Sequence, residues 1–193
     1  MYYIGVDLGG TNIAIGIVNE EFEIVKKGST PTKPERGADA IVADMAALSR
    51  KLLEEMGLTL DDVVSAGVAT PGTANNETGV VEYANNIPFL QYPLAAKLSA
   101  LLDNKPVYIE NDANAAAKAE AMAGVAKGAP FSVMITTAPV SAAVSSSAAR
   151  FTPASTSQVR NSATSSSKRT AVSAPAAERA AGKHTLPQPV SLT

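Results

Sequence analysis

Residues 6–12, VDLGGTN, place two glycines and a threonine between two runs of β-forming residues. Glycine has no Cβ, so its backbone N–H can approach a phosphate group closely, and a nearby hydroxyl can help to hold that group. A Gly-Gly pair between strands is also a common hairpin turn, so the motif alone leaves both interpretations open. It is not a Walker loop, because no Gly-Lys-Ser/Thr sequence follows.

Residues 109–117, IENDANAAA, place Asp112 where a strand ends and a helix begins. Side chains at that junction project into the cleft of an α/β sheet. A carboxylate there can accept a proton from a substrate hydroxyl, as a general base does. The alternative is that Asp112 only caps the helix.

Residues 83–89, YANNIPF, offer a third polar group. Asn85 and Asn86 lie in a predicted loop, shortly before Pro88. Their amides can bond to sugar hydroxyls. Loop asparagines are also ordinary turn formers, so this motif too has two interpretations.

Hydrophobic periodicity places these motifs on an α/β framework with a mixed sheet, because strands come first as a meander and then alternate with helices. Apolar residues recur at three- and four-residue intervals between Gly37 and Gly57, which predicts an amphipathic helix. We expect Pro93 in the first turn of a second helix, and a third helix that Asp112 can cap. The expected order is strands 2–8, 12–19 and 22–28, helix 37–57, strand 63–69, helix 92–102, strand 106–111, helix 112–124 and strand 131–136.

Charge and composition exclude several classes of protein. Residues 1–137 hold 17 acidic and 10 basic residues without a basic stripe, which argues against nucleic acid as a partner. No apolar run approaches the roughly 18 residues of a membrane span, and the N-terminus does not resemble a signal peptide. With no cysteine, the chain has neither disulfides nor thiolate metal sites. We expect a soluble, cytoplasmic protein.

The motifs DLGGTN, ATPGT, NNIP and ENDANAAA occur in the order and spacing typical of the ROK family of repressors, open reading frames and sugar kinases. Over residues 2–137 the chain resembles the N-terminal lobe of the family's bacterial glucokinases. The resemblance implies a ribonuclease-H-like, actin-like ATPase lobe, with sugar bound in a cleft between two lobes. It also implies ATP-dependent phosphorylation of a hexose, glucose first, by proteins that are often homodimers or homotetramers.

The resemblance assigns roles to individual residues. The groups expected to face the phosphates of ATP and Mg²⁺ are Asp7, Gly9, Gly10, Thr11 and Asn12. Those expected to face the hexose are Gly72, Asn86, Asn111 and Asp112, with Asp112 as general base.

The sequence changes character after Thr137. Residues 137–193 hold 19 serines and threonines and one aromatic residue, and residues 138–193 carry six basic side chains against one acidic. Such a composition cannot bury enough apolar surface to offset chain entropy. We therefore divide the chain into a lobe, 1–137, and a low-complexity tail, 138–193, expected to be disordered.

A shift of the reading frame accounts for this tail. The family continues into a second glycine loop close to GTGVGGG, then a Glu-Leu-Gly-His motif and a zinc site, CxCGxxGC, and the tail contains none of them. Codons chosen for residues 138–144, 160–168 and 174–184 spell all three motifs when translation starts one base earlier. The tail is therefore predicted to be an out-of-frame product that lacks the family's zinc site, and His184 is predicted not to be a ligand.

The sequence leaves three candidate functions. The first is a hexose kinase lineage of which this chain is a truncated, inactive form. The second is a ROK transcriptional regulator without its DNA-binding domain, disfavoured because regulators place a helix-turn-helix before the first strand, which here starts at Tyr2. The third is a non-enzymatic protein. It is either a sugar-binding fragment or a genuine short protein whose disordered basic Ser/Thr tail is used for binding, and the out-of-frame motifs count against the latter.

Overall fold

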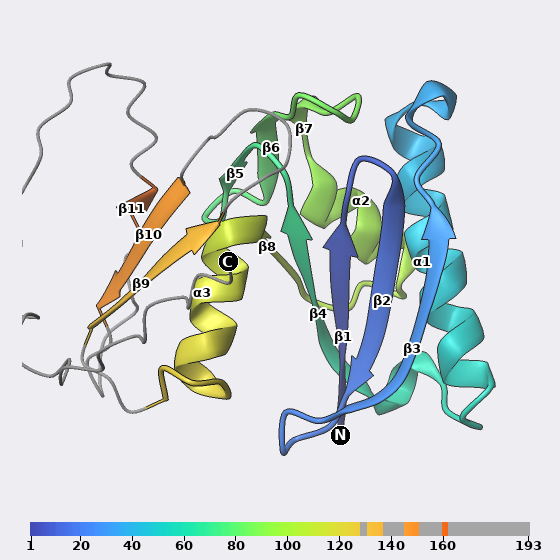
Figure 1. The fold of residues 1–193 in the computed structure, drawn as a ribbon. Helices are drawn as coiled ribbons and strands as arrows, with labels where there is room; N and C mark the ends of the chain where they lie inside the picture. The colour runs from blue at the N-terminus through green and yellow to red at the C-terminus, as the bar shows by residue number, and fades with distance from the viewer. Residues whose placement is uncertain (128–130, 137–144, 151–159, 162–193) are drawn as a thin grey trace, which may run out of the picture. The chain divides into compact units, whose positions relative to one another are not determined.

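A computed structural model describes residues 1–127, 131–136, 145–150 and 160–161. At its centre is a five-stranded sheet in the order β3-β2-β1-β4-β8 (Figure 1). Neighbours are antiparallel from β3 to β1 and parallel from β1 to β8, which confirms the predicted mixed sheet. The five strands are β1 (Tyr2–Leu8), β2 (Asn12–Val18), β3 (Ile24–Pro31), β4 (Val63–Thr70) and β8 (Val107–Asn111).

The two faces of this sheet differ in burial. On β1 the side chains of Ile4, Val6 and Leu8 are buried, because alternate residues of a strand point to one face. Tyr3, Gly5 and Asp7 alternate with them in the sequence and are exposed on the other face. The strand therefore places Asp7 on the solvent side of the sheet.

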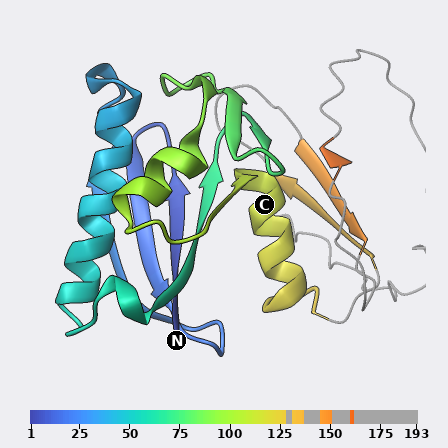
Figure 2. The same cartoon turned by 180° about the vertical axis from the view of Figure 1, so that it is seen from behind.

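Helices α1 (Ala38–Glu54) and α2 (Leu94–Leu101) cover the buried face, as the view from behind shows (Figure 2). The stripe predicted for α1 is confirmed by Ile41, Met45 and Leu52, whose side chains are almost fully buried. One detail was wrong: Pro93 is the N-cap residue of α2 and does not lie in its first turn. Proline has no backbone N–H, so it fits either position.

Five short elements have no counterpart in the sequence prediction. Three of them are strands that follow β4 and precede α2 in the sequence, and they form a second antiparallel sheet. Runs of three or four residues are too short for a hydrophobic period to stand out. These elements are η1 (Pro34–Arg36), η2 (Leu60–Asp62), β5 (Thr73–Asn75), β6 (Val80–Tyr83) and β7 (Leu90–Tyr92).

Helix α3 (Asp112–Met122) follows β8 directly, and β9 (Phe131–Thr136) confirms the last predicted strand. In the predicted tail the structure describes β10 (Ser145–Arg150) and β11 (Arg160–Asn161), so the expectation of no regular structure was wrong for these residues. Antiparallel pairing uses backbone groups, so a small polar sequence does not forbid it. The rest of 138–193, including the whole of a second unit, Thr164–Thr193, lies outside the described residues.

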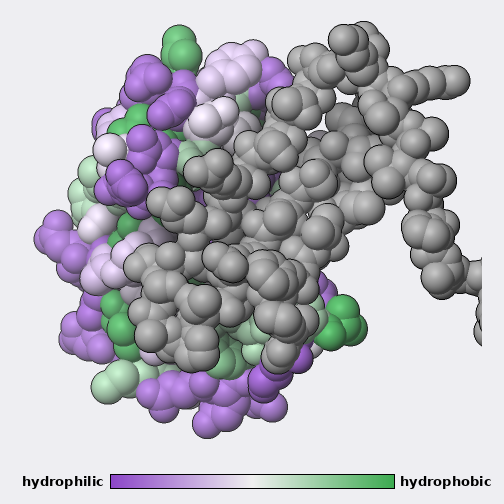
Figure 3. All heavy atoms as spheres, turned by 90° about the vertical axis from the view of Figure 1, so that its left-hand side faces the viewer, coloured by the Kyte–Doolittle hydropathy of each residue, from purple (hydrophilic) through white to green (hydrophobic). Residues whose placement is uncertain are grey.

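No helix in the described part of the chain combines the length and the apolar character that a bilayer crossing requires. On the side of the molecule where α3 lies, the residues coloured by hydropathy are mostly hydrophilic at the margin, with hydrophobic ones in small separate groups (Figure 3). Scattered apolar residues of this kind are ordinary for a protein surface.

Candidate functional site

The carboxyl ends of three parallel strands meet at one edge of the central sheet. Asp7 on β1 is level with Ala69 on β4, which is level with Glu110 on β8. Because neighbouring strands are about 4.8 Å apart, the backbones of Asp7 and Glu110 are separated by about 10 Å. The turns that leave these strands carry the glycines, asparagines and Asp112 singled out in the sequence, so the fold gathers them at this edge.

The β1–β2 turn is tight and internally bonded. Gly9 N–H donates to the Asn12 carbonyl at 2.9 Å, while the side chains of Thr11 and Asn12 are exposed. The predicted hairpin turn is thus present, and its exposed groups remain available to a ligand. Sequence reasoning missed the buried Thr32, whose hydroxyl donates to the Gly9 carbonyl at 2.7 Å. A single threonine outside any motif carries no signal that would have indicated this.

The β1–β2 turn and the asparagine loop come into direct contact. A Cβ placed on Gly10 would lie 3.0 Å from the Cβ of Asn86, which is closer than ordinary packing allows. Gly10 therefore lets the two loops approach each other. The contact brings a residue predicted to face phosphate beside a residue predicted to face sugar.

The asparagine loop is fixed by apolar neighbours on its own segment. Ile87 and Phe89 are buried, whereas Asn85 and Asn86 are exposed. The Phe89 ring stacks on Tyr92, with 4.7 Å between ring centroids. Burial, reinforced by a hydrogen bond to Asp39, raises the pKa of the Tyr92 hydroxyl, so it stays a neutral donor. The buried side chains of Ile87 and Phe89 therefore anchor the loop that exposes the two amides.

Gly72 holds the turn after β4 in a shape that other residues resist. Its φ is +87°, and an added Cβ would overlap the carbonyl oxygen of Tyr83 and come within 2.8 Å of the Ala84 Cα. Its own carbonyl accepts a hydrogen bond from Asn111 Nδ2 at 3.0 Å. The side chain of Asn111 thus joins the β4 turn to the end of β8.

Asn111 is also the cap of α3, which corrects the prediction that Asp112 caps this helix. Asn111 Oδ1 accepts from the backbone N–H groups of Ala113 at 3.1 Å and Asn114 at 3.2 Å. Its two polar atoms are therefore committed to the protein itself. Asp112 is the first residue of the helix and is exposed, with one oxygen accepting from Ala113 N–H at 2.8 Å. The capping alternative for Asp112 is wrong, because Asn111 does that work.

Glu110 organises the side chains behind this junction and was not singled out in the sequence. One carboxylate oxygen accepts from Asn111 N–H and Asn114 Nδ2, and the other pairs with Lys118 on α3. Burial raises the pKa of this carboxyl, but the bonds from Lys118 and Asn114 outweigh it, and the pKa lies below its ordinary value. Glu110 therefore stays ionised and ties α3 to the exposed face of the sheet.

A metal would find few ligands here. Within residues 1–127 no group of three or more His, Cys, Asp or Glu side chains is placed to hold an ion. Mg²⁺ bound with a nucleotide commonly takes one or two carboxylates and completes its shell with phosphate oxygens and water. The exposed carboxylate of Asp7, beside the β1–β2 turn, fits that requirement.

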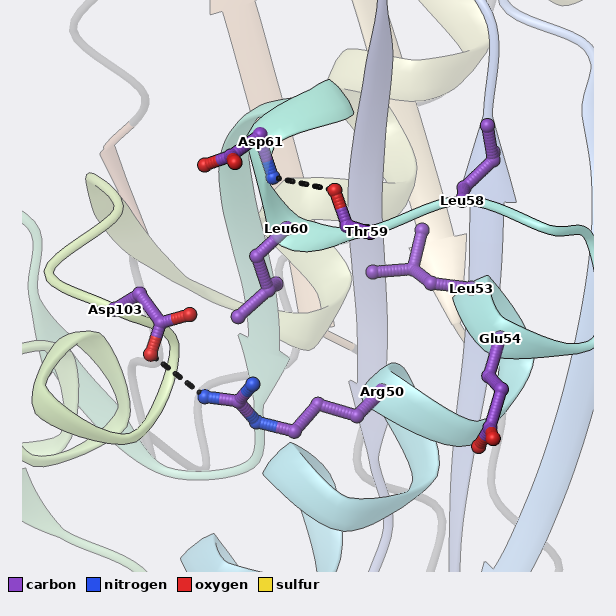
Figure 4. Close-up of a pocket in the computed structure, with 8 residues that line it drawn as sticks. All are labelled: Arg50, Leu53, Glu54, Leu58, Thr59, Leu60, Asp61 and Asp103. Carbon is purple, nitrogen blue, oxygen red and sulfur yellow. Dashed lines mark hydrogen bonds and ion pairs between the residues drawn. The ribbon is translucent and has the colours of Figure 1, made fainter.

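A pocket of about 330 Å³ lies at the opposite end of the lobe, near the amino ends of the parallel strands (Figure 4). Its polar wall includes Arg50, which donates to Asp103 at 2.8 Å and to the Leu101 carbonyl at 2.8 Å. Leu53 and Leu60 form apolar parts of the wall. None of the residues predicted to face sugar or phosphate lines this pocket.

Comparison with known proteins decides the family. The sequence profile of the ROK family matches residues 3–138. The chain belongs to the ROK family. The predicted resemblance is therefore confirmed for the part of the chain that carries the motifs.

Individual ROK proteins match the same part. Glucokinase of Streptomyces coelicolor is 40% identical over 127 residues, and N-acetyl-D-glucosamine kinase of Citrobacter koseri is 38% identical over 122 residues. These matches cover 65% and 63% of this chain but 37% and 38% of the two kinases. A ROK family glucokinase from Streptomyces griseus, solved with glucose and AMPPNP, has 32% identity and a TM-score of 0.66, covering 77% of this chain and 44% of that one. The predicted fold is confirmed, and the chain spans about two-fifths of these relatives.

Proposed function

We propose that residues 1–137 form the N-terminal lobe of an ATP-dependent hexose kinase, with Asp112 as the general base. The observation that carries this proposal is that Asn111 and Asp112 have different roles at the N-terminus of α3. Asn111 caps the helix and holds Gly72, which leaves the Asp112 carboxylate exposed at the edge where the sheet's parallel strands end.

The chemistry suits the arrangement. Transfer of a phosphoryl group to a primary hydroxyl requires that hydroxyl in line with the γ-phosphate and a carboxylate to take its proton. A positioned base is worth roughly 10²–10⁴ in rate. Asp112 would take the proton, and Asn86 would orient the sugar through its hydroxyls. Asn111 and Gly72 would shape the wall of the sugar site.

The nucleotide would be held at the β1–β2 turn. Its phosphates would bond to the backbone N–H groups of Gly9 and Gly10 and to the hydroxyl of Thr11. Asp7 and Asn12 would face the magnesium ion that accompanies ATP. When bound, Mg²⁺ spreads the negative charge of the β- and γ-phosphates.

We propose glucose as the sugar, because the glucokinase of Streptomyces coelicolor and the glucose-bound relative from Streptomyces griseus both match this lobe. The N-acetyl-D-glucosamine kinase matches it at similar identity, so N-acetyl-D-glucosamine is the main competitor. We also propose that the 193-residue chain is inactive. Residues 138–193 as written contain no second glycine loop and no Glu-Leu-Gly-His motif.

The test compares the 193-residue protein with a version in which one base is inserted after codon 137. Nucleotide sequencing across codons 130–145 accompanies it. With ATP as donor, we expect the repaired protein to phosphorylate glucose and the 193-residue protein to show no turnover. Faster turnover of N-acetyl-D-glucosamine would replace the proposed sugar. Normal turnover by the 193-residue protein would refute its inactivity, and no turnover of any hexose by a folded repaired protein would refute the kinase proposal.

A further inference from the structure

Thr32 is a buried polar residue that lies outside every motif of the sequence. It follows β3 directly, in the connection to η1, and its side chain has no exposed surface. Buried hydroxyls are normally bonded to a specific partner. The partner here is the β1–β2 turn, 23 residues earlier in the chain.

Thr32 holds that turn at two points. Its hydroxyl donates to the Gly9 carbonyl at 2.7 Å, and its backbone N–H donates to the Thr11 carbonyl at 2.8 Å. The turn adds a bond of its own, from Gly9 N–H to the Asn12 carbonyl. The two bonds from Thr32 therefore direct the Gly9 and Thr11 carbonyl oxygens toward Thr32, and the third closes the turn on itself.

The direction of a carbonyl fixes the direction of the next N–H. A trans peptide unit is planar, and its C=O and N–H point to opposite sides. Because the Gly9 carbonyl points toward Thr32, the N–H of Gly10 points away from Thr32. Among residues 1–127 this N–H has no hydrogen-bond acceptor. This N–H is thus a donor to which a phosphate oxygen could bond.

Glycine makes this restraint necessary. A Gly-Gly peptide can adopt positive and negative φ with little difference in energy, so the unit can rotate unless something holds it. We propose that Thr32 is a positioning residue for the phosphate site: its hydroxyl sets the direction of the Gly9–Gly10 peptide and keeps the Gly10 N–H turned outward. The identity of the ligand rests on the proposed function, whereas the direction of the peptide does not.

The experiment uses the purified 193-residue chain and four variants. Thr32→Val keeps the size and removes the hydroxyl, Thr32→Ala removes it without a risk of overpacking, and Thr32→Ser restores it. Ser49→Ala is the matched control, since Ser49 is equally buried and its hydroxyl also donates to a backbone carbonyl, that of Met45 at 2.8 Å. The first measurement is the NMR amide signal of Gly10, with its residual dipolar coupling. The second is a titration with Mg²⁺ and AMPPNP.

We expect Thr32→Val and Thr32→Ala to shift or broaden the Gly10 signal and to weaken AMPPNP binding roughly fivefold to tenfold, the effect of one lost hydrogen bond. Thr32→Ser and Ser49→Ala should leave both measurements as in the unaltered chain. A wild-type dipolar coupling that places the Gly10 N–H toward Thr32 would overturn the inference without any variant. An unchanged Gly10 signal in folded Thr32→Val would overturn it as well.

The two proposals fail in different ways. If the unaltered chain shows no response to AMPPNP, the nucleotide site of the proposed function is refuted for this chain. The Gly10 signal still decides whether Thr32 directs the peptide. If AMPPNP binds and Thr32→Val binds it equally well, the positioning role is refuted while the nucleotide site stands.

Discussion

At the carboxyl end of the parallel strands, some polar side chains bond to neighbouring protein groups, and others are left exposed. Both polar side-chain atoms of Asn111 bond to other protein groups. The neighbouring Asp112 is exposed, and one of its oxygens accepts from the Ala113 N–H. At the amino end, Arg50 in the wall of the pocket pairs with Asp103. A hollow of about 330 Å³, lined by described residues, lies at this amino end.

If the proposed function holds, the contrast teaches that a hollow alone does not identify the ligand site of this lobe. On the proposed function, the ligands bind at the carboxyl ends of the parallel strands, and a second lobe would complete that site. At the amino end, the pocket contains one matched ion pair, between Arg50 and Asp103. A choice made from this hollow would select the amino end, whereas the sequence motifs and the exposed carboxylate of Asp112 favour the carboxyl end.

The largest expected effect is on Asp112. In the frame-repaired protein, Asp112→Asn should lower the turnover number about 10²–10⁴-fold because the proton acceptor is lost. Sugar affinity should change little, since the amide still offers a polar group. The pocket-end control, Asp61→Asn, should leave turnover unchanged. Steady-state kinetics and glucose binding by calorimetry make the comparison, and full turnover in Asp112→Asn would remove the carboxylate from the mechanism.

Gly72 tests whether the turn after β4 tolerates another backbone shape. Gly72→Ala should lower the free energy of unfolding by about 2–4 kcal/mol, because a Cβ meets the Tyr83 carbonyl at positive φ. Gly67→Ala is the matched control: it lies on β4, and a Cβ there would meet nothing within 4 Å. Urea denaturation measures both. Equal midpoints for the two variants would show that the β4 turn tolerates other shapes.

Asn111 tests whether one side chain joins the β4 turn to α3. Asn111→Ala should cost about 2 kcal/mol, since it removes the cap and leaves the Gly72 carbonyl without its donor. Asn111→Asp keeps an oxygen for the cap and loses only the donor, so it should cost about half as much. The ordering of the two midpoints in urea is the measurement, and a larger loss in the aspartate variant would contradict it.

Glu110 gives this end a pH dependence. Its pKa is lowered in the folded protein from the ordinary value of 4.5, so its pairing with Lys118 and Asn114 contributes stability above that pH. The contribution is lost as the pH falls through the folded pKa. Glu110→Gln should therefore flatten the acid side of the stability profile, whereas Glu54→Gln at the pocket end, where the carboxylate is exposed, should not. Urea midpoints between pH 3 and 7 provide the test.

The framework of the lobe was predictable because its elements are long and strongly patterned. The stripe in α1 and the alternation in β1 follow directly from burial on one face, and both were confirmed. The motifs also located Asp112 and Asn86 on the correct junction and loop. Spacing along the chain is sufficient where a strand end or a helix start fixes a residue's position.

The remainder depends on contacts that no local pattern records. The choice of Asn111 over Asp112 as cap depends on backbone angles at one junction, because both residue types cap helices well. Thr32 and Glu110 act through residues brought to them by the fold, at separations of 23 residues for Thr32 and along α3 for Glu110. Such partners become visible only when the three-dimensional path of the chain is known.

The smallest expected effect is at the pocket end. Arg50 and Asp103 are about half and two-thirds exposed, so their ion pair should contribute at most about 1 kcal/mol. Arg50→Gln should lower the urea midpoint slightly at low salt, and the difference should narrow near 1 M NaCl as the charges are screened. Turnover of the frame-repaired protein should not change. A clear loss of turnover would show that the two ends of the sheet are coupled, and that the pocket belongs to the working site.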